Sequence, residues 1–310
     1  EGPKIRGVLM KERRISPRKM SAFKDFACVV PVLIFLAVFT YYPIVELVRI
    51  SFTDWNLLKD TWQYVGFKNW EWLFNGSGTK YLWNSLRVTI FYSIGELTIT
   101  LVGGMIFALI FNRMSRLFSI MRAVVFMPKY VAMSSAAVVF LWILNTDTGI
   151  LNYLLSLIGL GPVDWLGNRS TALLSVLMLT GWRCIGYGMM VYLSAMMGIS
   201  TDYYEAASLD GANAMQRFFK ITLPMLSPTT LFLFVTTFIS SMKVFQSVDI
   251  LTQGGPYRST EVFVYNIYRY AMVDFRMDRA ATVAIFFFVL LLIVTAATMK
   301  VSRGNVTYDS

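Results

Sequence analysis

Four ionisable side chains fall inside long apolar runs of this 310-residue sequence: Glu96, Lys129, Arg183 and Lys243. An ionisable group is costly inside a membrane, so each of these residues is a candidate for function or for a specific partner. Lys129 and Lys243 lie near the ends of their runs, where a long side chain can also reach the membrane surface in a structural role. Glu96 and Arg183 lie deeper. We expect these two to pair with each other or to contact a second subunit.

The composition indicates an integral membrane protein. Hydrophobic residues make up 56% of the chain and charged residues only 15%, whereas a soluble domain has about 25% charged residues. A bilayer core needs about 20 helical residues to cross it, with every backbone polar group bonded internally. Six runs meet this requirement and predict an all-α, polytopic membrane fold with six transmembrane helices: Phe26–Val48, Val88–Phe111, Ala123–Leu144, Ala172–Met197, Met225–Phe245 and Ala280–Met299.

Several classes of function are excluded by residues that the sequence lacks. It contains no His, which excludes His-based metal sites and His general bases. It has no G-x-x-x-x-G-K run to hold a nucleotide phosphate. Cys28 and Cys184 both lie in apolar runs, where we expect buried thiols rather than a disulfide. We therefore predict no catalytic residue and no metal ligand, and the basic charge, which flanks the predicted spans, does not indicate a nucleic acid partner.

The distribution of Lys and Arg predicts the orientation of the spans. The termini and two of the connecting segments together hold fifteen basic residues: Lys4, Arg6, Lys11, Arg13, Arg14, Arg18, Lys19, Lys24, Arg113, Arg116, Arg122, Arg217, Lys220, Lys300 and Arg303. The segments on the other side hold eight, spread over longer loops: Lys59, Lys68, Lys80, Arg169, Arg258, Arg269, Arg276 and Arg279. Because basic loops stay inside the cell, both termini are expected to be cytoplasmic.

One membrane domain is the simplest division of the chain. We expect a basic cytoplasmic arm over residues 1–25, a transmembrane domain over residues 26–300 and a cytoplasmic tail over residues 301–310. Two loop segments, Gly149–Ile158 and Glu261–Met272, have an amphipathic pattern. Each is expected to lie along the outer membrane interface or to pack on the helix bundle.

A polar stretch from Asp202 to Pro224 separates the fourth and fifth runs on the predicted cytoplasmic side. The spacing of Asp202 and Glu205 is that of a capping box, which starts a helix. Asp210-Gly211 then favours a turn, and a second helix is expected over Ala212–Lys220. Pro224 suits the first turn of the fifth span. Taken alone, such an element is either a tether between two spans or a surface that docks into a partner.

The same stretch resembles the E-A-A loop of binding-protein-dependent ABC importer permeases. Glu205-Ala206-Ala207, three residues, Gly211, nine residues and Ile221-x-Leu223-Pro224 follow the spacing of that loop. Further segments resemble the carbohydrate-uptake branch, with its maltose-type permeases: Tyr42-Pro43 with Ser51-Phe52, "YVGFKNW" at Tyr64–Trp70, Asn84-Ser85-Leu86 and "LTQGGP" at Leu251–Pro256. The resemblance covers about residues 26 to 300. The long basic arm is not a fixed feature of that branch, and no role is assigned to it.

The resemblance implies a transport subunit without catalytic activity of its own. In this family the E-A-A loop is a coupling helix that enters a cleft of a cytosolic ATPase. The residues carried over to that role are Glu205, Ala206, Ala207, Asp210, Gly211, Ile221, Leu223 and Pro224. The implied partners are a second permease, two ATPase subunits that bind the ATP and Mg²⁺, and an extracytoplasmic sugar-binding protein. The implied location is a bacterial-type cell membrane, and this chain itself holds no cofactor.

The resemblance also places a solute path along the fourth and fifth spans. These spans contain "GWRCIGYGMMVY" and "SSMKVFQSVD", which combine aromatic faces and polar groups suited to sugars. By position we carry over Tyr187 and Ser241, followed by Arg183 and Gln246.

Two alternatives remain at the level of the sequence. Arg183 and Lys243 would suit an anion such as glycerol-phosphate or another polar solute. A self-sufficient ion-coupled transporter would use Glu96 and Arg183 as a relay, but such proteins often have inverted repeats, and none is found here.

Overall fold

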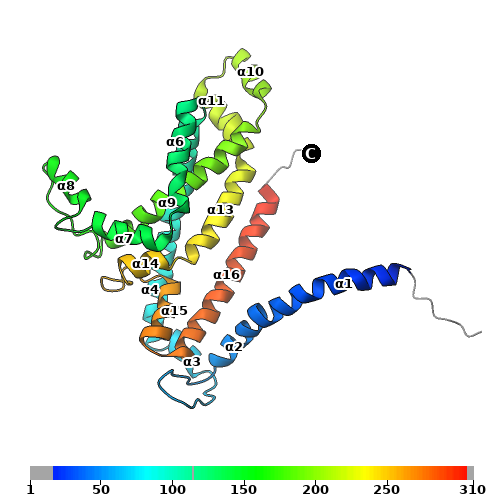
Figure 1. Ribbon diagram of the computed structural model, residues 1–310, viewed down its shortest axis with the longest axis vertical. Coiled ribbons are helices and arrows are strands. Elements are labelled where there is room, and N and C mark those ends of the chain that lie inside the picture. The colour runs from blue at the N-terminus through cyan, green and yellow to red at the C-terminus, as the bar shows by residue number, and fades with distance from the viewer. Residues whose placement is uncertain (1–16, 114, 306–310) are drawn as a thin grey trace, which may run out of the picture. The chain divides into compact units, whose positions relative to one another are not determined.

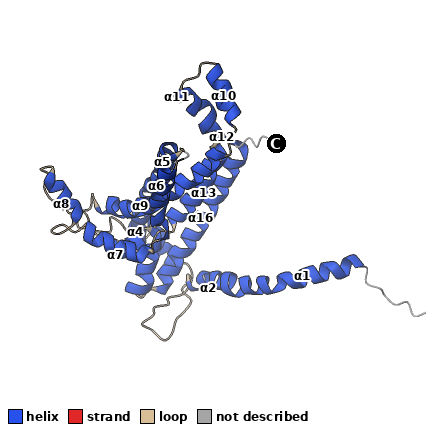
Figure 2. Ribbon diagram, turned by 45° about the horizontal axis from the view of Figure 1, so that its top comes forward, coloured by secondary structure: helices blue, strands red, loops and turns tan. Residues whose placement is uncertain are grey.

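The described part of the chain is built from helices and their connections. The computed structural model describes residues 17–113 and 115–305. Within them there is no β-strand, only one isolated bridge between Thr53 and Tyr64 (Figure 2). The prediction of an all-α fold is therefore confirmed for these residues. The chain divides into two compact units, Glu1–Arg49 and Ile50–Ser310, which are described separately.

The first unit is a helical segment with an apolar surface. Its elements are α1 (Pro17–Leu36), the π-helical turn η1 (Ala37–Tyr41) and most of α2 (Tyr42–Ile50). Residues Cys28–Ile50 are long and apolar enough to cross a membrane, close to the predicted run. Cys28 is exposed in this chain rather than buried as expected. The predicted arm boundary at residue 25 falls inside α1, and residues 1–16 of the arm lie outside the described residues.

The second unit is a bundle around four long helical segments that lie side by side (Figure 1). The first is continuous from Gly78 to Phe111 and consists of α4 (Gly78–Thr98), the π-helical turn η2 (Ile99–Gly103) and α5 (Gly104–Phe111). The others are α9 (Ala172–Met197), α13 (Ser227–Met242) and α16 (Met277–Asn305). The predicted fourth run has the same bounds as α9. Residues 306–310 of the predicted tail lie outside the described residues.

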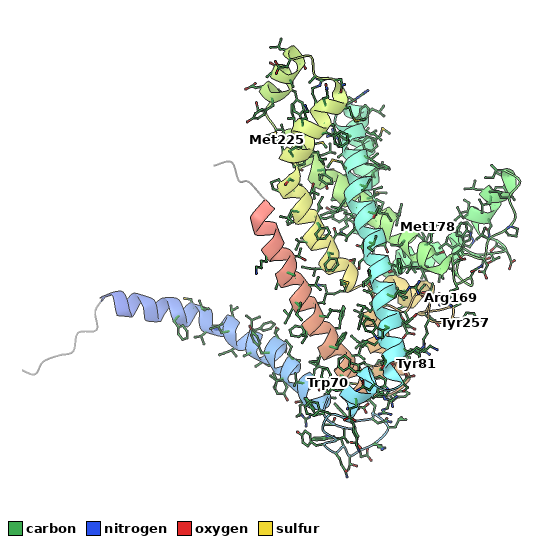
Figure 3. The ribbon with its side chains drawn as sticks, turned by 180° about the vertical axis from the view of Figure 1, so that it is seen from behind. Trp70, Tyr81, Arg169, Met178, Met225 and Tyr257 are labelled. Atoms are coloured by element: carbon green, nitrogen blue, oxygen red, sulfur yellow. The ribbon has the colours of Figure 1, made fainter. Side chains whose placement is uncertain are left out.

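Shorter elements join and flank the bundle. They are α3 (Lys68–Phe74), α6 (Arg116–Phe126), the 3₁₀ turn η3 (Met127–Tyr130), α7 (Met133–Ile143), α8 (Ile150–Leu157), α10 (Thr201–Leu209), α11 (Ala214–Arg217), the π-helical turn η4 (Phe218–Thr222), α12 (Leu223–Met225), α14 (Gln246–Leu251), α15 (Phe263–Tyr268) and the π-helical turn η5 (Arg269–Val273). In Figures 1 and 2, α10 and α11 lie at one end of the bundle, where α5 and α6 also meet. Figure 3 shows Trp70 and Tyr81 at the end opposite Met225.

By length and composition, four described helices can cross a membrane, or up to six if each of two bent pairs is one span. The first bent pair, Arg116–Tyr130 and Met133–Ile143, turns through 102°. The predicted third span, Ala123–Leu144, lies across this bend and is therefore not one regular helix. The break follows Pro128, which has no backbone N–H to donate, and at Val131 the backbone is extended.

The second bent pair, Ala214–Met225 and Ser227–Met242, turns through 61°. Pro224 lies in the short helix α12, whereas Pro228 occupies the first turn of α13. The predicted role of Pro224 in starting the fifth span therefore belongs to Pro228. The span also ends at Met242 rather than Phe245, because Lys243 leaves the helical conformation.

The packing of α9 depends on a residue without a side chain. Helix α9 packs against α5 and η2, and Gly188 lies directly against the Thr100 carbonyl of η2. A Cβ atom at this position would collide with that backbone oxygen, whose place is fixed by the helix. Small residues permit such close approach between membrane helices.

Side-chain amides fix the loops at the end of the bundle opposite α10. Asn69 donates to the carbonyls of Ser51 and Thr53 at 3.0 and 2.7 Å, and Asn84 donates to the Arg258 carbonyl at 2.8 Å. These bonds give a structural role to Asn69 of the "YVGFKNW" segment and to Asn84 of the Asn84-Ser85-Leu86 segment.

Both amphipathic loop segments contain helices: α8 in the first, α15 with η5 in the second. Helix α15 packs on α4 and α16, which corresponds to the second of its two predicted placements.

Replacing Gly188 with Ala should destabilise the protein, because the added methyl group forces α9 away from η2. We expect a loss of about 1–3 kcal/mol in the free energy of unfolding, seen as a lower midpoint of thermal unfolding in detergent. Gly161→Ala is the matched control, since a Cβ at Gly161 would have no atom within 4 Å. Equal midpoints for the two variants would contradict the role of this contact.

Candidate functional site

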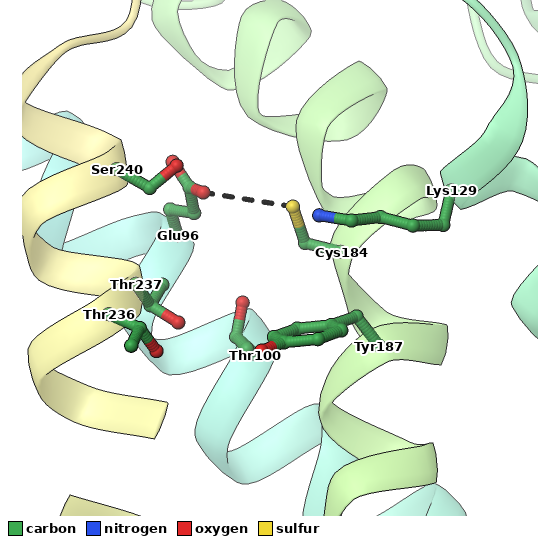
Figure 4. Close-up of a pocket in the computed structure, with 8 residues that line it drawn as sticks. All are labelled: Glu96, Thr100, Lys129, Cys184, Tyr187, Thr236, Thr237 and Ser240. Atoms are coloured by element: carbon green, nitrogen blue, oxygen red, sulfur yellow. Dashed lines mark hydrogen bonds between the residues drawn. The ribbon is translucent and has the colours of Figure 1, made fainter. Parts of the chain in front are cut away.

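Two adjoining cavities lie between α4, α9, α13 and the break in the third run. The smaller has a volume of about 160 Å³ and the larger about 410 Å³. They share four lining residues: Glu96, Lys129, Cys184 and Ser240. The smaller cavity is completed by hydroxyl-bearing side chains, as Figure 4 shows: Thr100, Tyr187, Thr236 and Thr237. Most of the residues that line the two cavities therefore carry a polar or charged side chain.

Glu96 and Lys129 face this space from opposite sides (Figure 4). Glu96 is only 5% exposed, and the Cys184 thiol donates to its Oε1 atom at 3.7 Å. The Lys129 ammonium lies 4.8 Å from the centre of the Tyr187 ring, within the range of a cation–π interaction. Lys129 thus contributes to the cavity.

Arg183 is held by groups that carry no charge. Its Nη1 donates to the Met133 sulfur at 3.4 Å and its Nη2 to the Lys129 carbonyl at 3.2 Å. The second bond satisfies a carbonyl left free where the third run breaks. The expected ion pair between Glu96 and Arg183 is absent from the ion pairs of the described residues. That part of the prediction is wrong, because the break places neutral acceptors nearer to the guanidinium.

The structure brings three of the four predicted path residues together. Arg183 and Gln246 line the larger cavity and Tyr187 lines the smaller. Ser241 is fully buried, and its hydroxyl donates to the Phe238 carbonyl at 2.8 Å. The neighbouring Ser240 lines both cavities instead.

Three cavity residues were not predicted from the sequence, although a helical pattern marks them: Thr100, Thr236 and Thr237. Thr236 and Thr237 lie four and three residues before Ser240, and Glu96 lies four residues before Thr100. Residues at these intervals share one face of a helix. The two faces meet across the smaller cavity.

A second candidate site is the knob, which we define as residues 201–222, from α10 through η4. Helix α10 begins after Ser200, whose hydroxyl accepts from the Asp202 N–H. The predicted capping box at Asp202 and Glu205 is therefore wrong, since the cap lies two residues earlier. The second helix begins at Ala214, with a capping box between Asn213 and Gln216, two residues later than predicted.

Gly211 joins the two helices of the knob. Its φ angle is +75°, a left-handed conformation that glycine adopts without strain. The Gly211 N–H bonds the Ser208 carbonyl at 3.1 Å, and the next N–H, of Ala212, bonds the Ala207 carbonyl at 2.9 Å. This pair of bonds is the Schellman motif that ends α-helices. The predicted turn at Asp210-Gly211 is confirmed.

Side-chain bonds fasten the two halves of the knob to each other. The Arg217 guanidinium donates to the Ser208 hydroxyl at 2.9 Å, and the Tyr204 and Thr222 hydroxyls bond at 2.9 Å. Of the residues carried over from the E-A-A loop, Glu205, Ala206, Asp210, Gly211, Leu223 and Pro224 are exposed, and Ala207 and Ile221 are half-buried. Large apolar side chains are also exposed, including Leu209 at 90% and Met215 at 65%. An exposed apolar surface of this kind is typical of a docking site.

Residues 100–303 match the family described as "Binding-protein-dependent transport system inner membrane component". The chain is a member of this family. The matched range contains the knob and most of the cavity residues. The permease has several apolar helices that can cross a membrane, and its family consists of inner membrane components of transport systems.

Curated relatives extend the similarity over most of the permease. "Probable ABC transporter permease protein YurN" of Bacillus subtilis is 34% identical, over 87% of this chain and 93% of the relative. "Trehalose/maltose transport system permease protein MalF" of Thermococcus litoralis is 29% identical, over 90% and 93%. "sn-glycerol-3-phosphate transport system permease protein UgpA" of Escherichia coli is 27% identical, over 93% and 97%.

A solved structure has the same fold. It is a chain of "a bacterial ABC transporter involved in the import of the acidic polysaccharide alginate", with a TM-score of 0.81. The two chains are 26% identical, over 93% of this permease and 98% of that chain. The predicted resemblance to ABC importer permeases is confirmed by these comparisons.

The cavities predict that Cys184 is reachable from water despite its place in a membrane helix. In a Cys28→Ser background, a small neutral methanethiosulfonate should modify Cys184, because this thiol lines both cavities. Ala172→Cys in a cysteine-free background is the control. Ala172 is fully buried in the same helix and should stay unmodified. Intact-protein mass spectrometry measures both; an unreactive Cys184 in folded protein would refute a hydrated cavity.

Proposed function

We propose that this chain is the permease subunit of an ATP-driven importer for a carbohydrate. Membership of the binding-protein-dependent family is the observation that carries the proposal. The maltose-type relative and the alginate importer, which both act on saccharides, support carbohydrate as the solute. Under this proposal the chain forms the translocation path with a second permease, and an extracytoplasmic sugar-binding protein delivers the solute.

In the proposed path, the two cavities are the part that this subunit contributes. Tyr187 offers a ring face, and Gln246, Ser240 and Thr236 offer groups that can bond sugar hydroxyls. Two buried hydroxyls at the cavities, those of Thr100 and Ser247, have no bonding partner among the described residues. Unsatisfied buried polar atoms favour a polar solute or water over lipid.

The knob is proposed to couple the path to cytosolic ATPases, which bind the ATP and Mg²⁺. Its exposed apolar residues and Glu205 would enter a groove on one ATPase partner. Since α9 leads into the knob and α13 follows it, a force on the knob acts on both helices that line the cavities. The side-chain bonds between its halves let it move as one body.

The proposed orientation has six spans with the knob and both termini in the cytoplasm. The excess of Lys and Arg supports it. The bundle end that carries the knob also receives the junction of α5 and α6 (Figures 1 and 2), where Arg113, Arg116 and Arg122 occur without an acidic residue. The C-terminal end of α16 points toward the same end.

A glycerol-phosphate solute is the second candidate within this class. The glycerol-3-phosphate relative supports it, as do the basic residues Arg183 and Lys243 at the larger cavity.

Reconstitution of the complete transporter in vesicles tests the proposed function. Uptake of solute should require ATP and the binding protein, and dissipating ion gradients should leave it unchanged, because hydrolysis by the partners supplies the energy. The chain alone, without any ATPase, should not accumulate solute. Accumulation by the chain alone, driven by an ion gradient, would establish the alternative of an ion-coupled transporter.

Gly211→Val tests coupling through the knob. A side chain in the left-handed conformation costs about 1–2 kcal/mol, so the joint should distort while membrane insertion is unaffected. We expect uptake and solute-stimulated ATP hydrolysis to fall together. Gly211→Asn is the control, because Asn tolerates this conformation, and it should retain both activities. If both survive in Gly211→Val, the knob is not the coupling element.

A further inference from the structure

We propose that the solute path of this permease is built for a saccharide that carries negative charge. The proposal rests on the proposed transport function and specifies its substrate class. The larger cavity is lined by three basic side chains, Lys129, Arg183 and Lys243, but by only one acidic side chain, Glu96. Within the described lining residues, the charge of the cavity is therefore positive by two when these groups are ionised.

Of these three residues, only Lys129 has an acid near enough for an electrostatic interaction within the described part of the chain, which is Glu96, and the two do not form an ion pair. None of them takes part in the ion pairs of the described residues. The bonds of Arg183 go to a thioether and a carbonyl, and its buried Nε–H has no partner. Lys129 faces the Tyr187 ring. For Lys243, the described residues provide no side-chain hydrogen bond or ion pair.

Like charges gathered in a membrane helix bundle repel one another and are costly to desolvate. A structural role does not explain why three basic residues gather here. Arg183 bonds one carbonyl at the break, and a neutral donor could do the same. A cavity that holds three cations instead stabilises an anion that enters it. A carboxylate or a phosphate binds best to such groups, since Arg and Lys donate strong, charge-assisted bonds to their oxygens.

Tyr187 and the hydroxyl groups of the smaller cavity restrict the chemical class of the anion further. These groups line the smaller cavity together with Lys129 (Figure 4), and they suit a ring with hydroxyl groups. Arg183 and Lys243 line the adjoining larger cavity. The shared chemistry is thus a sugar bearing a carboxylate, as in a uronic acid, or a phosphate. Both sources would use the same three cations.

The test compares two acidic sugars with a neutral sugar, all built from galacto-configured rings. Digalacturonate, galactobiose and galactose 6-phosphate are titrated by calorimetry into the purified transporter, with all its subunits, in nanodiscs. A hydrogen bond to a charged group contributes about 1.5–3 kcal/mol, equal to about 10- to 100-fold in affinity. We expect at least one of the two acidic sugars to bind more tightly than the neutral one by that factor. The acidic sugar that does so identifies carboxylate or phosphate as the source.

Charge-removing variants assign the preference to this cavity. Lys243→Gln should reduce the ratio of the affinities for the acidic and the neutral sugar about tenfold. Arg183→Gln should reduce this preference in the same way. If the Arg183→Gln protein does not fold, the result for Lys243→Gln is decisive. Arg169→Gln removes the same charge from an exposed loop outside the cavity, and it should retain the preference.

Three outcomes overturn the inference: equal affinity for acidic and neutral sugars, tighter binding of the neutral sugar, or no binding of any of the three. A preference that persists in Lys243→Gln but disappears in Arg169→Gln also overturns it. These results are distinct from failure of the proposed function. ATP-dependent uptake of neutral sugar alone would support the proposed importer function and contradict only the inference that the solute is acidic.

Discussion

A bilayer offers no hydrogen-bond partners to the backbone, and this constraint governs the structure described here. Each departure from regular helix must find its partners within the protein. At the break in the third run, the Arg183 guanidinium supplies a donor to the Lys129 carbonyl. A polar side chain therefore stabilises this irregular segment. A regular helix bonds its own backbone groups and needs no such partner.

The same constraint connects the cavity with the fold. A residue such as Arg183 both satisfies the broken backbone and contributes charge to the space beside it. The close approach of Gly188 to the Thr100 carbonyl brings η2 beside α9, with Thr100 and Tyr187 on the border of one cavity. Packing and solute chemistry thus depend on the same few contacts.

Much of this arrangement follows from the sequence, and the remainder has identifiable causes. The apolar run of α9 was predicted with its bounds, because it is continuous and contains no Pro. The left-handed turn at Gly211 was predicted from Asp-Gly chemistry. The 102° bend was not predicted. Many membrane helices tolerate a Pro such as Pro128, and hydropathy gives no information on the direction in which a helix runs. Ser240 was missed in favour of Ser241, because a difference of one residue is a rotation of 100° around a helix.

The cap of α10 shows a further limit of local patterns. Asp202 and Glu205 have the spacing of a capping box, but Ser200 two residues earlier has the extended backbone that a cap requires. Two competing caps within three residues cannot be ranked by spacing alone. The prediction of two helices joined by a glycine was still correct, because it depends on the order of these elements and not on where each helix begins or ends.

Lys129 reaches the cavity from η3, a 3₁₀ turn of only four residues. Such turns have poorer hydrogen-bond geometry than α-helices and rearrange at lower cost. A local unwinding of these four residues would withdraw an ammonium group from the cavity and lower its affinity for an anion. Release of the cargo could then begin at a single short turn, before any of the long helices changes its tilt.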